Sequence, residues 1–387
     1  MSFHLSDSET GEATGATGAV VVIGSSVMDV IGRPLNALQP RSSAPGLVRM
    51  SPGGVARNVA ENLARLGVEV VLLTAVGDDP PGRHLLEQAQ AAGVDVRHAL
   101  TMAGERTGMY LAMLDPQGGL HLALDDMGLV RSLNQDYLRS KISILEQAQA
   151  IFLDANVLPG SLELVLAIAG RKGIPVAADP TSASLAANLR PHLKHLWLVT
   201  PNLTEAEILC PDPVLHADRA PLHGAPSGVP FQDPLRDPLR DAQREARGDA
   251  TTRRSATPRD PLQGTQRDPL QGAQRDPLQG TQRDTALHAA RRLVAEGVKI
   301  ALVTMAEFGV GYASAETSGH IPAVTTEVVD PTGAGDAQTA AVLFGLLSGI
   351  PLDESVRLGA SAAALTLRTS GSVAPDLSLE RLYDGLR

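Results

Sequence analysis

The 387-residue sequence has a single cysteine, Cys210, so no disulfide bond can form within the chain. No stretch approaches the roughly 20 apolar residues of a transmembrane helix, and the N-terminus lacks the basic start and apolar run of a signal peptide. Basic residues number 33 against 43 acidic ones, and this balance disfavours nucleic acid and anionic membranes as partners. We therefore expect a soluble, cytoplasmic protein.

Two common nucleotide-binding motifs are also missing. No lysine follows a glycine, which excludes the Gly-Lys-Ser/Thr phosphate-binding loop. No Gly-x-Gly-x-x-Gly fingerprint occurs, and this disfavours an enzyme that transfers hydride from a dinucleotide.

Glycine and proline are plentiful, at 37 and 27 residues, and part of the excess lies in one tract. Residues 211–284 lose apolar periodicity and contain an eight-residue repeat that starts at Arg259, Arg267 and Arg275. A proline every eight residues prevents a long helix. We interpret residues 211–284 as a disordered low-complexity insertion, with a docking element for a partner as the alternative. Residues 1–18 are expected to form a disordered tail.

The rest of the chain alternates short apolar runs with segments of helical periodicity. Residues 20–23 indicate a buried strand, and residues 56–66 indicate a helix that closes at Gly67. This alternation predicts βαβ units and a mostly parallel sheet covered by helices. Further strand-like runs are residues 68–76, 150–154, 176–179, 196–200 and 300–304.

One hairpin interrupts this alternation. Residues 107–114 and 120–126 are two strand-like runs joined by Asp-Pro-Gln-Gly-Gly, which favours a turn. Such a hairpin in an α/β protein serves as a lid or an oligomer contact, or is a plain edge hairpin.

The most informative segment is Asp-Pro-Thr-Gly-Ala-Gly-Asp at residues 330–336, between an apolar strand end and a helical pattern. Its glycines let the backbone N–H groups of Gly333, Ala334 and Gly335 converge at the positive end of the helix. Asp336 would repel a bound phosphate, but it suits a general base that takes a proton from an attacking hydroxyl. The alternative is a tight turn with Asp336 as the helix N-cap.

Three polar positions near the N-terminus suit a sugar. The Gly53-Gly54 pair lets a ligand approach the backbone, and Asn58 offers a donor and an acceptor to hydroxyl groups. Asp29 can hold a pair of sugar hydroxyls. The alternatives are a turn residue at Asp29 and a helix-surface group at Asn58.

Asn202 and Glu205 follow a strand and lie on one face of the first turn of a helix. This spacing suits side chains that hold waters around Mg²⁺. Taken alone, the same spacing favours a helix-capping pair.

Together and in this order, these segments resemble the ribokinase/PfkB family of carbohydrate and nucleoside kinases. Residues 53–58 resemble its first signature, residues 330–336 its second, and residues 202–205 its Mg²⁺-associated Asn-x-x-Glu motif. The resemblance covers nearly all of the chain apart from the tail and the repeats, and it implies a single domain formed by residues 19–210 and 285–387. It implies a ribokinase-like three-layer α/β/α fold with a small antiparallel β lid, whose strands would lie around residues 34–50 and 100–126.

Within the family, residues 54–67, 110–119 and 122–127 resemble the pseudouridine kinases. That resemblance implies transfer of phosphate from ATP to the ribose 5′-hydroxyl of pseudouridine. A ribokinase- or adenosine-kinase-like enzyme with another acceptor is the alternative, and a catalytically silent sugar sensor is a third reading. The family's use of the lid also implies a homodimer.

The resemblance assigns a role to each site residue. Asp336 would be the base, and Gly333, Ala334 and Gly335 the anion hole. The ribose would contact Asp29, Gly53, Gly54 and Asn58, with Thr107 reaching it from the lid. The nucleotide would lie near Thr304, Gly309, Thr332, Gly333 and Gly335. Mg²⁺ would be held through water by Asn202 and Glu205, and K⁺ by Asp330 and Thr332 with the loop near Gly371.

Three residues depart from the family pattern. Ala306 stands where a glycine is frequent in the nucleotide segment, Gln338 replaces a common phenylalanine, and Ala341 replaces a common glycine. We expect the last two positions to affect helix packing more than chemistry.

Overall fold

The computed structural model describes residues 18–39, 41–116, 119–212 and 277–386 of the chain. The chain divides into two compact units, one formed by residues 1–211 and 276–387 and the other by residues 212–275. Nearly all of the expected tail and most of the expected insertion lie outside the described residues. The description that follows concerns the described part of the first unit.

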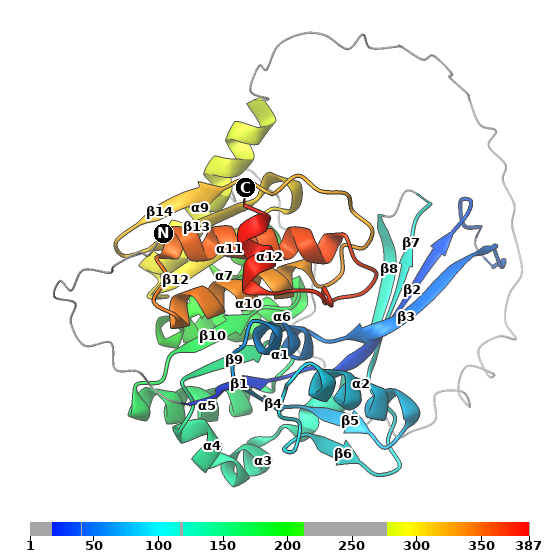
Figure 1. Cartoon of the computed structure of the whole chain (residues 1–387), viewed down its shortest axis with the longest axis horizontal. Coiled ribbons are helices and arrows are strands. Elements are labelled where there is room, and N and C mark those ends of the chain that lie inside the picture. Colours follow the sequence, from blue (N-terminus) through cyan, green and yellow to red (C-terminus); the bar gives the residue numbers. More distant parts are fainter. Residues whose placement is uncertain (1–17, 40, 117–118, 213–276, 387) are drawn as a thin grey trace, which may run out of the picture. The chain divides into compact units, whose positions relative to one another are not determined.

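Short apolar runs form a central sheet of eight strands, in the order β14-β13-β12-β11-β10-β9-β1-β4 (Figure 1). The strands from β12 to β4 in that order are parallel, and β13 and β14 are antiparallel to their neighbours. The bounds are Val20–Ile23 (β1), Val70–Leu73 (β4), Ala150–Asp154 (β9), Val176–Asp179 (β10), Leu198–Val199 (β11), Ile300–Thr304 (β12), Val310–Ser314 (β13) and Ser318–Ile321 (β14).

Two helix layers cover the two faces of this sheet. In β1, Val20 and Val22 join one core, while Val21 and Ile23 join the other, because successive side chains point to opposite faces. The first core also contains residues of α1 (Val55–Arg65), α2 (Pro80–Ala91), α10 (Ala334–Leu347) and α11 (Leu352–Leu367). The second contains residues of α3 (Gln135–Ser140), α4 (Ile142–Glu146), α5 (Pro159–Lys172), α6 (Ala183–Leu189), α7 (Leu203–Leu209) and α9 (Pro277–Ala295). The expected three-layer α/β/α fold is confirmed.

A second sheet of four strands forms the lid, in the order β3-β2-β7-β8 (Figure 1). Its strands are β2 (Val27–Pro34), β3 (Gly46–Gly53), β7 (Met109–Leu114) and β8 (Leu120–Asp126). The expected hairpin is confirmed, since β7 and β8 pair antiparallel and Asp115 Oδ1 accepts a hydrogen bond of 2.8 Å from the Gly119 N–H. The lid is mixed, because β2 and β7 are parallel.

The lid strands differ from the expected boundaries in two places. The first arm, expected around residues 34–50, is formed by β2 and β3, so it begins earlier and ends later. The strand β6 (Leu100–Met102) pairs with β5 (Ala75–Gly77) in a separate two-stranded sheet, so the start of residues 100–126 is not part of the lid.

The helix α9 begins at Pro277, within the last repeat copy and before residue 285, where the domain was expected to resume. Proline is favourable at the first helical position, because its missing N–H would have no partner there. A short helix, α12 (Leu379–Asp384), and three 3₁₀ turns, Gly128–Ser132, Arg190–His195 and Ala306–Phe308, complete the elements. Within the described ranges, no helix is both long enough and apolar enough to cross a membrane.

Candidate active site

The glycine-rich segment forms the N-terminus of α10. Gly333 is the N-cap residue, with φ +78°, and a Cβ there would lie 2.0 Å from the carbonyl oxygen of Ser372. Only glycine fits such a position. The first N–H groups of a helix have no partner within it and form its positive end. Ala334 and Gly335, in this first turn, line a cavity, so the geometry is suited to an anion.

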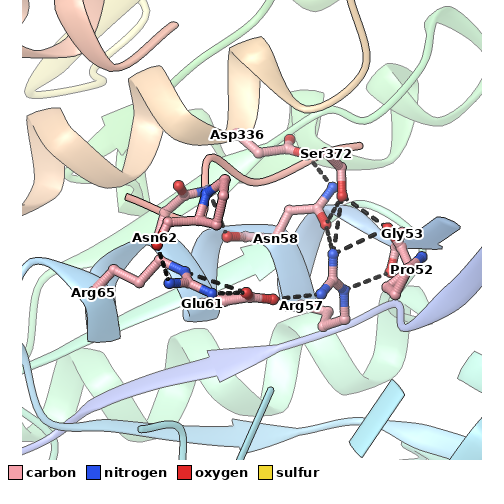
Figure 2. A network of polar contacts seen from close by, with 10 residues as sticks. Pro52, Gly53, Arg57, Asn58, Glu61, Asn62, Arg65, Asp336 and Ser372 are labelled. Atoms are coloured by element: carbon pink, nitrogen blue, oxygen red, sulfur yellow. Dashed lines mark hydrogen bonds and ion pairs between the residues drawn. The ribbon is translucent and has the colours of Figure 1, made fainter. Parts of the chain in front are cut away.

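Asp336 and Asn58 meet at this helix end, although 278 positions separate them in the chain (Figure 2). Asn58 Nδ2 donates a hydrogen bond of 2.6 Å to Asp336 Oδ2. Burial raises the pKa of Asp336 to about 6, against the opposing effects of this hydrogen bond and the positive charge of Arg57. A carboxylate with that pKa is ionised at neutral pH and remains basic enough to accept a proton.

Asp29 reaches the same place from the lid strand β2. Its side chain is 5% exposed and lies against Gly53, where a Cβ would be 2.3 Å from the carboxylate. Burial raises the pKa of Asp29 to about 7, and the charge of Arg57 acts in the opposite direction. Gly54 is the N-cap of α1 with φ +95°, and a Cβ there would lie 2.5 Å from the carbonyl oxygen of Ser25. Of the residues expected to hold a sugar, Asp29 and Gly53 therefore lie against each other.

A cavity of about 810 Å³ adjoins the start of α10. It is lined by both residues expected near the nucleotide after β12, Thr304 and Gly309, and by Asn202. Apolar side chains such as Val324 and Leu367 form much of the rest of its wall. A pocket of this volume with an apolar wall and the amides of a helix N-terminus suits a nucleotide.

Ala306, one of the three departures from the family pattern, also lines this cavity. Its φ is +47°, a conformation that favours glycine and is costly for alanine.

Asn202 and Glu205 form a complete capping box at the start of α7. Asn202 Oδ1 accepts from the Glu205 N–H, and Glu205 Oε2 accepts from the Asn202 N–H, both at 2.9 Å. The capping interpretation therefore holds locally. Glu205 Oε1 takes part in neither of these two hydrogen bonds.

Asp179, at the end of β10, is a residue that sequence reasoning missed. Burial and, to a lesser extent, the negative charges of Asp336 and Glu205 together raise its pKa to about 8. Three carboxyl groups thus share the carboxyl edge of the sheet, and a cation there would stabilise their ionised forms. Within the described ranges, no group of three or more His, Cys, Asp or Glu side chains has direct metal-ligand geometry. The residues fit a magnesium ion held through water. An aspartate that ends a buried strand was the available sequence signal.

Asp330 has a different environment from the one expected. Its carboxylate accepts hydrogen bonds from the N–H groups of Thr332 (3.0 Å) and Gly371 (2.9 Å). It also forms an ion pair of 2.5 Å with Arg49, which reaches it from the lid strand β3. The carboxylate already has a resident positive charge, so in this arrangement these residues do not fit K⁺.

Thr107 is engaged at the base of the lid. Its hydroxyl donates to Asp79 Oδ1 and accepts from the Gly77 N–H at 3.0 Å. Asp79 is the N-cap of α2, so Thr107 fastens the start of that helix. A contact between Thr107 and a nucleoside stays a prediction.

Comparison with known proteins adds the family. The sequence profile of the pfkB family carbohydrate kinases matches residues 18–221 and 273–378. A pseudouridine kinase of Escherichia coli strain K12 is 29% identical over 361 residues, covering 93% of this chain and 94% of the relative. A putative sugar kinase from Clostridium perfringens has a similar structure, with a TM-score of 0.66 and 25% identity over 95% of each chain. A putative ribokinase II from E. coli in complex with ATP and Mg²⁺ has a TM-score of 0.67 at 18% identity, over 95% of this chain and 99% of that one. The chain belongs to the pfkB family of carbohydrate kinases and is a phosphotransferase with a hydroxyl acceptor.

Proposed function

We propose that this chain transfers the γ-phosphoryl group of ATP to the ribose 5′-hydroxyl of pseudouridine. The contact between Asn58 and Asp336 at the N-terminus of α10 supports a sugar kinase, because it places a base beside a polar group suited to sugar hydroxyls. The similarity to the E. coli pseudouridine kinase supports this acceptor. A ribokinase- or adenosine-kinase-like acceptor is the second candidate.

In the proposed reaction, the acceptor oxygen forms a bond to the γ-phosphorus as the bond to the β–γ bridging oxygen breaks. Asp336 takes the proton of the attacking hydroxyl, which it can do because its pKa of about 6 leaves it ionised at neutral pH. Negative charge that develops on the phosphoryl oxygens faces the first N–H groups of α10. Asp29 and Asn58 would orient the ribose.

Magnesium would be held through water by Asn202 Oδ1 or Glu205 Oε1 with Asp179 nearby, and would supply positive charge to the phosphates. The cavity that contains Thr304 and Gly309 would take the adenosine part of ATP. The lid would cover the nucleoside and exclude water, which limits hydrolysis of ATP.

The lid also leaves large apolar side chains in solvent. Leu122 and Leu124 on β8 are 62% and 65% exposed, and Leu47 and Val48 on β3 are 69% and 74% exposed. We propose that a second copy of the chain covers this sheet, as expected from the family resemblance. Light scattering on a sizing column tests this, and a monomer at micromolar concentration would contradict it.

The decisive experiment measures ADP release with pseudouridine, uridine, adenosine, ribose and fructose phosphates as acceptors. Pseudouridine is expected to give the highest kcat/KM, and Asp336→Asn is expected to lose nearly all turnover while its thermal unfolding stays close to that of the wild type. Turnover with another acceptor but none with pseudouridine would reject the proposed substrate and leave a sugar kinase. No turnover with any acceptor, together with ligand binding unchanged in Asp336→Asn, would favour the sugar sensor.

A further inference from the structure

Arg57, in the first turn of α1, is a buried arginine whose side chain is 2% exposed (Figure 2). All three nitrogens of its guanidinium have partners. Nε donates to the Gly53 carbonyl at 3.1 Å, and Nη1 forms an ion pair of 2.5 Å with Glu61. Nη2 donates to the Pro52 carbonyl (3.1 Å), Ser372 Oγ (2.9 Å) and Asn58 Oδ1. One rigid fork therefore joins the end of a lid strand, the helix α1 and the loop around residue 372.

The first consequence concerns the Asn58 amide. Its oxygen faces two donors, since Arg57 Nη2 donates to it and Ser372 Oγ lies 2.8 Å away. Its nitrogen therefore points to Asp336 Oδ2, at 2.6 Å. The flipped amide would turn its two N–H groups toward the guanidinium, which has no acceptor, and its oxygen toward a carboxylate. Arg57 thus determines which end of Asn58 meets Asp336.

The second consequence concerns the anion-binding turn. The carbonyl oxygen of Ser372 occupies the space beside Gly333, where a Cβ would come within 2.0 Å. The hydroxyl of the same serine is held by Arg57. The guanidinium therefore braces the loop that packs against the N-cap of α10.

We propose that Arg57 is a positioning residue for phosphoryl transfer: it directs the Asn58 amide to Asp336 and holds the Ser372 loop against Gly333. The base and the anion-binding amides lie at the same helix end, so both depend on this one fork. The inference rests on the part of the proposed function that concerns phosphoryl transfer, and it does not depend on which acceptor is phosphorylated.

The chain offers a matched control on the same helix. Arg65 also pairs with Glu61, at 2.8 Å, but its other described partner is the Pro375 carbonyl at 2.7 Å. Arg65→Met removes a cation from Glu61 and leaves the contacts of Asn58 and Ser372 in place. A difference between Arg57→Met and Arg65→Met therefore reports positioning, not the loss of a charge beside Glu61.

The experiment measures kcat and KM for Arg57→Met, Arg57→Lys and Arg65→Met, using whichever acceptor the wild type phosphorylates fastest. We expect Arg57→Met to lower kcat about 100-fold, because a small misplacement of a base has effects of that order. Arg57→Lys keeps the positive charge but loses the planar guanidinium with its several donors, and its kcat is expected to fall almost as much as that of Arg57→Met. Added guanidinium ion at millimolar concentration is expected to restore part of the activity of Arg57→Ala, and ethylammonium is not. In an Asn58→Ala background, Arg57→Met is expected to cost much less than in the wild type.

Three results would overturn the proposal. These are a kcat of Arg57→Met within threefold of that of Arg65→Met, full activity in Arg57→Lys, or additive effects of Arg57→Met and Asn58→Ala. If Arg57→Met fails to fold, the pair Arg57→Met with Glu61→Leu, which removes both buried charges together, replaces it in the same comparison.

A readout without turnover separates this inference from the proposed function. Hydrogen exchange of the backbone amides at residues 333–336 and 371–374 is expected to be faster in Arg57→Met than in Arg65→Met. If the wild type phosphorylates no acceptor, the proposed function fails, while this exchange difference still decides whether Arg57 positions the two loops. Equal exchange in the two variants would refute the positioning role.

Discussion

Replacing Asn58 by alanine is expected to move the acid limb of the pH–rate profile. The substitution removes the 2.6 Å hydrogen bond that Asn58 Nδ2 donates to Asp336 Oδ2. That bond stabilises the ionised carboxylate, so its loss favours the protonated form and raises the pKa of Asp336. Protonated Asp336 cannot accept the proton of the acceptor hydroxyl. Activity should therefore begin to fall at a higher pH in the variant than in the wild type.

The size of the shift follows from the strength of the bond. A hydrogen bond to a charged group contributes about 1.5–3 kcal/mol, and Asp336 is partly exposed, so the lower end applies. One pKa unit corresponds to about 1.4 kcal/mol, which gives a rise of about one unit. From the present pKa of about 6, the limb should move to about pH 7.

The assay is kcat/KM for the acceptor between pH 5 and 9, measured by ADP release. Asp29 and Asp179 also titrate in this range, with pKa values of about 7 and 8. The test is therefore the difference in the pH of the acid limb between the variant and the wild type, and not the pH of the limb in either protein alone. Asn62→Ala is the matched control, because Asn62 Nδ2 donates to the Asn58 carbonyl and not to Asp336. A limb that stays at the same pH in Asn58→Ala would refute the assignment of Asp336 as the base.

Three further predictions test separate features. Burial raises the pKa of Asp29 from 3.8 to about 7, so its carboxyl group ionises at a lower pH in the unfolded chain than in the folded one, and the free energy of unfolding falls as the pH rises from 4 to 7. Asp29→Asn should reduce that fall by up to about 4 kcal/mol, as measured in urea titrations. An equal pH dependence in both proteins would contradict this. Gly333→Ala should lower the Tm and abolish turnover, because the new Cβ would lie 2.0 Å from the Ser372 carbonyl oxygen. In Gly335→Ala the new Cβ has no atom within 4 Å, so the Tm should stay within about 2 °C of that of the wild type. Arg49 supplies the positive charge beside Asp330, so the rate of the wild type should be equal in K⁺ and in Na⁺. The rate of Arg49→Met should depend on K⁺. A wild type that needs K⁺ would disprove this role.

The fold could be predicted because its signals are local. Residues 20–23 are apolar at every position, which indicates a strand buried on both faces, and the Gly-Gly turn of the hairpin needs no partner elsewhere in the chain. The start of α9 was missed because proline at a first helical position has the same appearance in sequence as proline in a repeat.

The site was predictable in its motifs but not in its contacts. The order of the motifs brought Asn58 and Asp336 into one hypothesis, yet no sequence pattern shows that their side chains meet. Arg57 could not be found from sequence, because its partners include two backbone carbonyls and a serine more than 300 positions away. The spacing of Asn202 and Glu205 suits both a capping box and a hydrated metal, and only the folded chain shows that the capping bonds form.

The helices on either side of the repeat tract pack against each other: α7 ends at Leu209 and α9 begins at Pro277. The two ends that the tract connects are thus already held together by the core. For a connection without structure of its own, as the sequence predicts for this tract, the entropy cost of joining such ends grows only with the logarithm of its length, so one more or one fewer eight-residue copy would change it by about 0.1 kcal/mol. Gains and losses of repeat copies are therefore nearly neutral for folding, and the length of the tract can drift between related chains while the kinase core stays the same.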